Sequence, residues 1–148
     1  MRKILHLDSP RDHYHCDAAV VWCFDQRFAI AYRKLLKRAG IQHPDSIIVA
    51  GGAKCLASPN PDAEREFVLD QIGTSIRLHG TDRVMLMVHS DCGAYGGLAA
   101  FTGDEKAEST HHHAELQRAA AFLRHQLPQL SIDCYFVNFE GIWQIDAA

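Results

Sequence analysis

The stretch RVMLMVHSDC, residues 83–92, decides the fold because a strand signal runs directly into chemically reactive residues. Its apolar residues form a nearly continuous run up to Val88, which is typical of a strand covered on both faces of a sheet. Three other short apolar runs, residues 18–24, 46–50 and 132–139, predict three further strands. The first two of these are also nearly continuous.

Segments with a helical period separate these four predicted strands. Apolar residues recur every three or four positions over 28–39, and Gly40 follows as a helix-ending residue. A second helix is predicted from Asn60, as N-cap, to Gly80, and a third carries its apolar stripe over 116–127. Strands that alternate with helices require a parallel sheet with right-handed crossovers. The sequence therefore predicts an α/β fold.

Length and composition support one ordinary globular domain. The chain has 148 residues, 47% hydrophobic and 22% charged, with a formal net charge of −3. This charge does not favour nucleic acid or an anionic membrane as partner. The apolar runs are shorter than the ~20 residues of a membrane span, and residues 1–6 lack a signal-peptide core, so we expect a soluble, cytoplasmic protein. We expect residues 18–148 to form the domain and residues 1–17 an N-terminal arm or edge strand.

Ligand-type side chains follow two of the predicted strands. Cys23 ends the first apolar run, and His89 and Cys92 end the third. Sites in open parallel sheets form at the carboxyl ends of strands, so these three side chains converge if the two strands are neighbours. Two thiolates and one imidazole are good zinc ligands, and three protein ligands leave a fourth position open, as in catalytic sites. We therefore predict a Zn²⁺ site.

Two charged residues next to Cys23 complete the candidate site. Asp25 is placed to accept a hydrogen bond from a zinc-bound water and orient it. Arg27 can hold Asp25 as an ionised, bidentate partner and keep it off the metal. Asp25 and Arg27 are therefore the predicted catalytic residues.

These residues resemble the zinc signature of the β-class carbonic anhydrases. The resemblance rests on Cys23-x-Asp25-x-Arg27 and His89-x-x-Cys92-Gly93, and it extends over residues 18–139. It implies a four-stranded parallel core in the order 2-1-3-4. It also implies a zinc lyase in which a zinc-bound hydroxide attacks carbon dioxide to give bicarbonate. A homodimer or a higher even-numbered homo-oligomer is implied as well.

The chain departs from the family pattern at several points. Gly52 stands where the family has Asn, Gln26 stands where it usually has Ser, and the long helical N-terminal arm is missing. Two other functions therefore stay open. One is a zinc-binding regulatory or interaction module without hydratase activity, and the other is a related hydrolase of carbon disulfide or carbonyl sulfide.

Two groups of histidines lie outside the predicted site. His13, His15 and Cys16 are expected to form a polar segment before the first strand, with a second metal site as the alternative. The run 111–113 consists of three histidines and is expected to be a solvated helix start, with a proton-shuttle or accessory-metal role as the alternative.

Three further residues carry reactive groups. Cys55 follows the Gly51-Gly52 pair and is interpreted as a bystander near the site, while Cys134 alternates with apolar residues and is predicted to lie in the core. Asp91 is expected to cap the turn after His89 or to pair with a nearby base.

Overall fold

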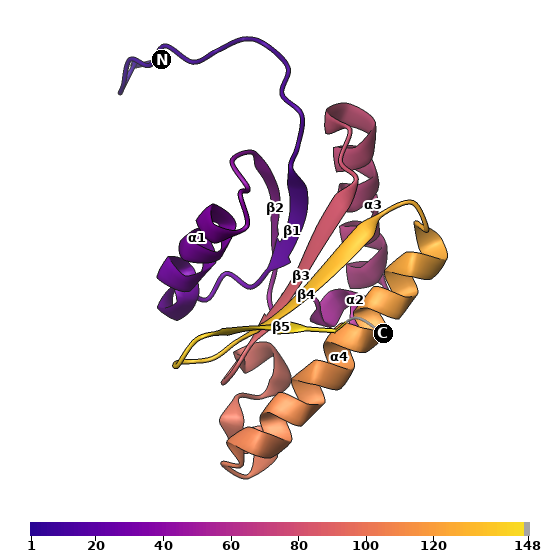
Figure 1. Ribbon diagram of the computed structural model, residues 1–148. Coiled ribbons are helices and arrows are strands. Elements are labelled where there is room, and N and C mark those ends of the chain that lie inside the picture. Colours follow the sequence, from indigo (N-terminus) through magenta and orange to yellow (C-terminus); the bar gives the residue numbers. More distant parts are fainter. Residues whose placement is uncertain (147–148) are drawn as a thin grey trace.

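Five strands form one mixed sheet within residues 1–146, the part of the chain that the computed structural model describes (Figure 1). The strands are β1 (Ala18–Trp22), β2 (Pro44–Ile48), β3 (Arg83–His89), β4 (Ser131–Val137) and β5 (Ile142–Ile145). Their order is β2-β1-β3-β4-β5. The predicted α/β fold and the parallel order of the first four strands are confirmed.

The fifth strand was not predicted from the sequence. β5 pairs antiparallel with β4 through a hairpin whose turn is closed by Asn138. The Asn138 side-chain oxygen accepts hydrogen bonds from the backbone N–H groups of Glu140 and Gly141. A four-residue strand of mixed polarity carries little periodic signal, so the sequence predicted the four-stranded parallel core and not this added strand.

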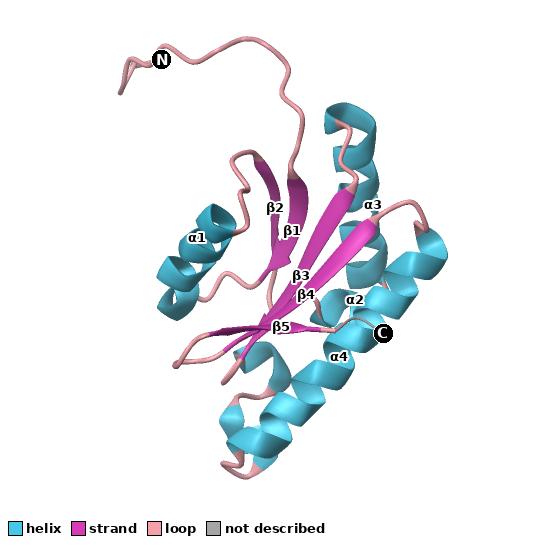
Figure 2. Ribbon diagram, viewed as in Figure 1, coloured by secondary structure: helices cyan, strands magenta, loops and turns pink. Residues whose placement is uncertain are grey.

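Figure 2 shows the helices that surround the sheet. They are α1 (Ala29–Arg38), α2 (Lys54–Ala57), α3 (Ala63–His79) and α4 (Glu105–Gln126), with short 3₁₀ helices η1 (Gln26–Phe28), η2 (Gly93–Tyr95) and η3 (Leu98–Phe101). α3 begins after Asp62 rather than after Asn60. α4 begins well before the predicted stripe at 116, because the Asp104 side chain caps it by accepting from the N–H groups of Lys106 and Ala107.

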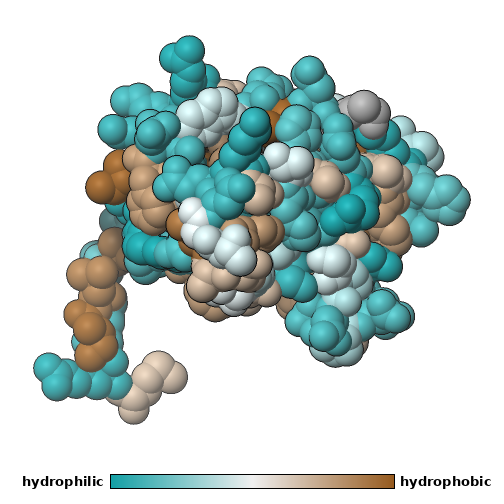
Figure 3. All heavy atoms as spheres, turned by 90° about the horizontal axis from the view of Figure 1, so that it is seen from below, coloured by the Kyte–Doolittle hydropathy of each residue, from teal (hydrophilic) through white to brown (hydrophobic). Residues whose placement is uncertain are grey.

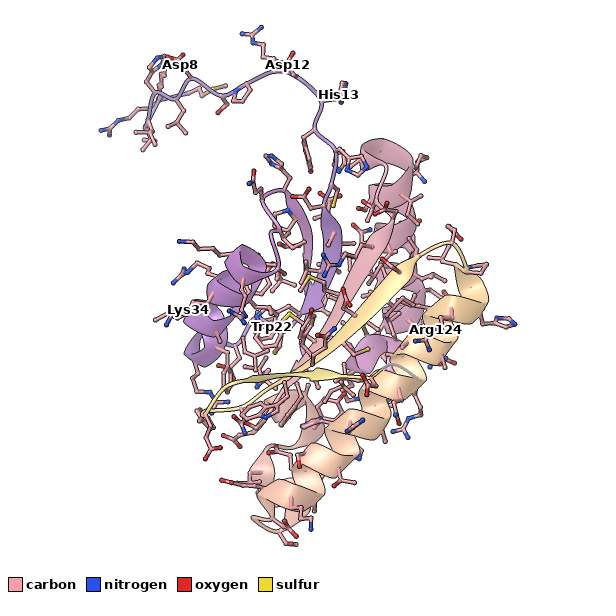
Figure 4. All side chains as sticks on the ribbon, in the orientation of Figure 1. Asp8, Asp12, His13, Trp22, Lys34 and Arg124 are labelled. Carbon is pink, nitrogen blue, oxygen red and sulfur yellow. The ribbon has the colours of Figure 1, made fainter. Side chains whose placement is uncertain are left out.

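The helices cover both faces of the sheet and create two cores (Figure 1). On one face, α1 packs through Phe28, Leu35 and their neighbours against one set of alternating strand residues. On the other face, α2, α3 and α4 bury the opposite set, which includes Leu86 and the predicted core residue Cys134. Figure 4 shows Trp22 between α1 and the sheet, while Lys34 points away from the body. The burial of Cys134 confirms that prediction.

The edge strand and the N-terminal segment are less covered than the central strands. β2 lies at the sheet edge and alternates between half-buried and exposed residues, so the expectation that both its faces are covered was wrong. Residues 1–17 contain no strand, and the first part projects from the body with exposed apolar side chains (Figure 3). Tyr14 anchors its end, because its hydroxyl donates to Asp45 at 2.7 Å.

None of the helices within residues 1–146 is long and apolar enough to cross a membrane.

Candidate metal centre

The pairing of β1 with β3 brings the predicted metal ligands together. The two strands run parallel with Val21 opposite Leu86, so their carboxyl ends share one edge of the sheet. Cys23 follows β1 directly, His89 is the last residue of β3, and Cys92 precedes η2. Their ligand atoms all lie within 4.8 Å of one another, and all three residues are buried. The sheet topology therefore produces the predicted convergence.

The imidazole of His89 is oriented for ligation. Its Nδ1 lies 2.8 Å from the backbone oxygen of Ser90, which can only accept, so Nδ1 carries the proton. Nε2 is then a free lone pair, and it is buried without a hydrogen-bond partner. Trp22 and Phe28 pack against the ring at centroid distances of 5.5 and 4.8 Å. A buried, unpaired ring nitrogen beside two thiols is the state expected of a metal ligand.

The two cysteines differ in their acidity. Hydrogen bonding from the Cys92 thiol, the largest cause, and from the backbone of Gly51 and Asp25 lowers the pKa of Cys23 against the effect of burial. The pKa of Cys92 is raised, because it faces the Cys23 sulfur and is buried. A thiolate is therefore favoured at Cys23, and the two-sulfur, one-nitrogen donor set fits zinc.

Asp25 and Arg27 form the predicted ion pair beside this cluster. The Arg27 Nη2 donates to Asp25 Oδ2 at 2.6 Å, and Nε lies 3.1 Å from both carboxylate oxygens. These hydrogen bonds from Arg27 lower the pKa of Asp25 to about 2. The same Oδ2 atom lies 3.9 Å from His89 Nε2. An ionised carboxylate thus sits at the edge of the cluster and is turned toward the guanidinium.

Asp91 binds the other side of the same guanidinium. Arg27 Nη1 donates to Asp91 Oδ2 at 2.8 Å, and Nη2 donates to the Asp91 backbone oxygen at 2.9 Å. The Asp91 Oδ1 atom accepts from the Leu98 N–H at 2.9 Å. Both alternatives stated for Asp91, capping of a turn and pairing with a base, are therefore present.

Gly52 is explained by a close approach of the backbone. Its φ is +56°, and a Cβ there would lie 2.3 Å from the Met87 backbone oxygen on β3. The next residue donates its N–H to that oxygen at 3.0 Å. Any side chain would push this loop away from β3. The glycine at the position where the family has Asn is thus required by the packing of this chain.

The cluster opens into a cavity of about 630 Å³. Cys23, Asp25, Arg27, Asp91 and Cys92 all line it, together with the glycine-rich segments around them. Both candidate thiol ligands and the candidate catalytic pair therefore face one shared space, which a small molecule can occupy.

The other candidate residues lie elsewhere. In the segment before β1, His13 and His15 are exposed, whereas Cys16 is buried. His112 lies within α4 and is completely buried, which contradicts the predicted solvated helix start. Cys55 is buried in α2, where its Sγ donates to the Gly52 oxygen. Within residues 1–146, Cys23, His89 and Cys92 are the sole group of three such ligands that is close enough for a metal.

Two buried carboxylates near the site were missed. Glu108 and Glu115 of α4 are both almost completely buried. Their spacing of seven residues, with His112 between them, places all three on one face of the helix. Acidic residues are rarely buried, so neither residue was predicted to lie near the site.

A family comparison accounts for nearly the whole chain. Residues 14–147 match the profile of a family described as "Putative carbonic anhydrase". The chain belongs to this family. Two uncharacterised proteins are similar to this chain in sequence. One, from Rickettsia bellii, is 23% identical over 95% of this chain and 90% of its own length. The other, from Rickettsia conorii, is 22% identical over 95% of this chain and 80% of its own.

Solved carbonic anhydrases share the fold. A carbonic anhydrase from Glaciozyma antarctica matches with a TM-score of 0.55 and 22% identity over 89% of this chain and 83% of that one. A β-carbonic anhydrase from Trichomonas vaginalis matches with a TM-score of 0.57 and 15% identity, over 95% and 87%. A third structure, the β-carbonic anhydrase CafA from Aspergillus fumigatus, matches with a TM-score of 0.55 and 14% identity. The match covers 91% of this chain and 77% of that one. At these identities the likeness concerns the fold. The Cys–His–Cys cluster of this carbonic anhydrase family member has the composition of a β-class zinc site.

Proposed function

We propose that this protein is a zinc-dependent carbonic anhydrase that interconverts carbon dioxide and bicarbonate. The observation that carries the proposal is the unpaired, buried Nε2 of His89 within 4.8 Å of two buried cysteine sulfurs. Family membership and the fold support the same reaction. The working assembly is proposed to be a homo-oligomer in the cytoplasm.

Cys23, His89 and Cys92 would hold the metal, with the fourth position left to solvent. Zinc bound in this way supplies a Lewis acid that brings the pKa of water to about 7, which makes a nucleophile available at neutral pH. The Ser90 backbone oxygen holds the His89 ring by its Nδ1–H and fixes the tautomer that ligation needs.

Asp25 and Arg27 would orient the attacking water. Because Arg27 holds the pKa of Asp25 at about 2, the carboxylate is ionised at neutral pH and can only accept hydrogen bonds. A water in the cavity would therefore donate a hydrogen bond to Asp25. This bond would direct the lone pairs of the water oxygen into the cavity. Arg27 acts by keeping Asp25 in place.

The proposal is tested by metal content and by stopped-flow hydration of carbon dioxide. The purified protein should hold about one zinc per chain, and Cys23→Ser should lose most of it, because serine stays protonated where a thiolate binds. Cys134→Ser is the matched control, since this buried thiol lies in the core and should leave zinc content unchanged. Asp25→Asn should keep zinc while hydration falls roughly 10–100-fold, as for other groups that orient metal-site partners.

Two outcomes would refute the proposal in different ways. Full zinc retention in Cys23→Ser would show that the cluster is not the metal site. A wild-type protein with zinc bound and no hydration at any pH would instead favour a zinc-binding module without hydratase activity.

A further inference from the structure

Arg27 is poorly placed to restrain Asp25 by itself. Its side chain is 44% exposed, and an ion pair that solvent reaches holds its partners only weakly. Yet the Asp25 oxygen that it holds lies 3.9 Å from His89 Nε2, and a carboxylate is itself a competent zinc ligand. Something else must fix the guanidinium if Asp25 is to stay turned toward it.

Asp91 provides this second attachment. It accepts hydrogen bonds from Arg27 with its carboxylate at 2.8 Å and with its backbone oxygen at 2.9 Å. The Arg27 side chain thus donates to Asp25 from one edge and to Asp91 from the other. Because the guanidinium is planar and rigid, attachment on two edges fixes its position and orientation.

The chain around Asp91 is built to hold its carboxylate. Asp91 has a φ of +50°, in the left-handed region that few residues other than glycine adopt. Its Oδ1 accepts from the Leu98 N–H, and a Cβ on Gly97 would lie 2.9 Å from that oxygen. The segment 91–98 therefore packs closely around the Asp91 carboxylate.

Glu108 fixes Asp91 from a different element. It is 2% exposed, and its Oε1 accepts from the Asp91 backbone N–H at 2.7 Å. His112 Nε2 lies 3.7 Å from the same oxygen, which is too far for a hydrogen bond. Burying a carboxylate is costly without a donor, and Asp91 supplies one. α4 is thus joined through Asp91 to the guanidinium and so to the edge of the metal cluster.

We propose that Asp91, held by Glu108, is a positioning residue that fixes Arg27 and thereby keeps the Asp25 carboxylate turned away from the Cys23–His89–Cys92 cluster. This inference rests on the proposed function, because it assigns a task to residues around the proposed metal. It goes beyond the pairing of Asp25 with Arg27 by placing control of that pair in the segment 91–98 and in α4.

The test is a double-mutant cycle on cobalt(II)-loaded protein, read by its visible absorption spectrum. Asp91→Asn is made in the wild type and in Asp25→Asn. Asparagine replaces one of the two carboxylate oxygens by an NH₂ group, which cannot accept, so either the bond from the Leu98 N–H or the bond from Arg27 to the side chain is lost. In the wild-type background, the released Asp25 should bind the metal and shift the spectrum. In the Asp25→Asn background no carboxylate is present, so the shift should disappear.

Matched variants separate positioning from loss of structure. Glu108→Ala removes the acceptor of the Asp91 N–H and should shift the cobalt spectrum in the same direction, whereas Glu108→Gln keeps an oxygen for that N–H and should not. Thermal unfolding of each variant is measured alongside. If Asp91→Asn fails to fold, Glu108→Ala takes its place in the cycle.

The proposal is overturned if Asp91→Asn leaves the spectrum unchanged, or if the shift is equally large in Asp25→Asn. The cycle does not need turnover, so it can succeed in a protein that hydrates no carbon dioxide, which would refute the proposed function alone. In an active enzyme, Asp91→Asn should lower kcat roughly 10–100-fold with zinc retained.

Discussion

Loss of the Tyr95 hydroxyl should destabilise the protein through a buried carboxylate. Tyr95 lies in η2, three residues after Cys92, and its hydroxyl donates to Glu115 at 3.0 Å. Glu115 is completely buried in α4 and also accepts from Ser58 at 2.5 Å and from Arg118. The hydroxyl therefore attaches the segment after Cys92 to the long helix behind the sheet.

The magnitude follows from the charge and burial of the acceptor. A hydrogen bond to a charged group contributes about 1.5–3 kcal/mol. Tyr95→Phe leaves Glu115 with two other donors, so no charge is stranded and the lower end applies, about 1.5 kcal/mol. In a chain of this size each kcal/mol changes Tm by about 2–4 °C, so Tm should fall by about 3–6 °C.

Tyr32→Phe is the matched control for this substitution. Tyr32 is also half-buried, but its hydroxyl forms a hydrogen bond of 2.7 Å with the neutral Ser46 hydroxyl, and such a bond contributes about 1 kcal/mol on average. Urea unfolding followed by circular dichroism measures both variants. Equal losses of unfolding free energy in the two would refute the argument from charge.

The Tyr95→Phe effect should also depend on pH with a definite sign. Although burial opposes it, hydrogen bonds from Ser58, Arg118 and Tyr95 lower the pKa of Glu115 from its ordinary value of 4.5. A depressed folded-state pKa contributes stability that is present above 4.5 and is lost as the pH falls through the folded value. The difference in unfolding free energy between wild type and Tyr95→Phe should therefore become smaller in acid. A difference that grows in acid would contradict an ionised Glu115.

Two further predictions concern positions away from the ligands. Gly52→Ala should destabilise the fold by about 1–3 kcal/mol in urea unfolding, because the new Cβ would meet the Met87 oxygen. The control is Gly40→Ala, at a similar φ but with open space around the Cβ, which should lose less unfolding free energy. Burial opposes the shift at Asp45, but hydrogen bonds, the largest from Ser75, lower its pKa from 3.8 to about 2. Its contribution to stability is thus present above pH 3.8 and lost as pH falls toward 2, so Asp45→Asn should flatten the decline of stability over that range.

The features that the sequence predicted well are those in which one local pattern determines the outcome. Continuous apolar runs identified β1 and β3, and the residues after them fell at the same sheet edge because parallel strands end together. Spacing after Cys23 and His89 then predicted which side chains meet. The boundaries of the helices were less accurate, because Asp62 and Asp104 rather than Asn60 and the apolar stripe determine where α3 and α4 begin.

The polar face of α4 shows why part of the site could not be predicted. Glu108, His112 and Glu115 interrupt the apolar period of this helix, so its first half has the pattern of a solvated segment. Their burial depends on partners from distant parts of the chain: the Asp91 N–H for Glu108, and Ser58 and Tyr95 for Glu115. Such pairings connect residues that no local period relates, and only the tertiary structure shows them.

These same pairings give a reason for the burial of two acidic residues, Glu108 and Glu115, in one helix of a small domain. The loop 90–97 carries Cys92 and lies between β3 and η3. The Ser90 N–H still donates to the Val137 oxygen on β4, but residues 91–97 belong to no strand. α4 holds this loop at two points, through Glu108 at the Asp91 N–H and through Glu115 at the Tyr95 hydroxyl. A thiol ligand must be kept within a fraction of an ångström of its productive position, and charge-assisted hydrogen bonds are directional where apolar contacts are not. The buried Glu108 and Glu115 of α4 therefore hold the loop that carries Cys92, one of the three candidate metal ligands.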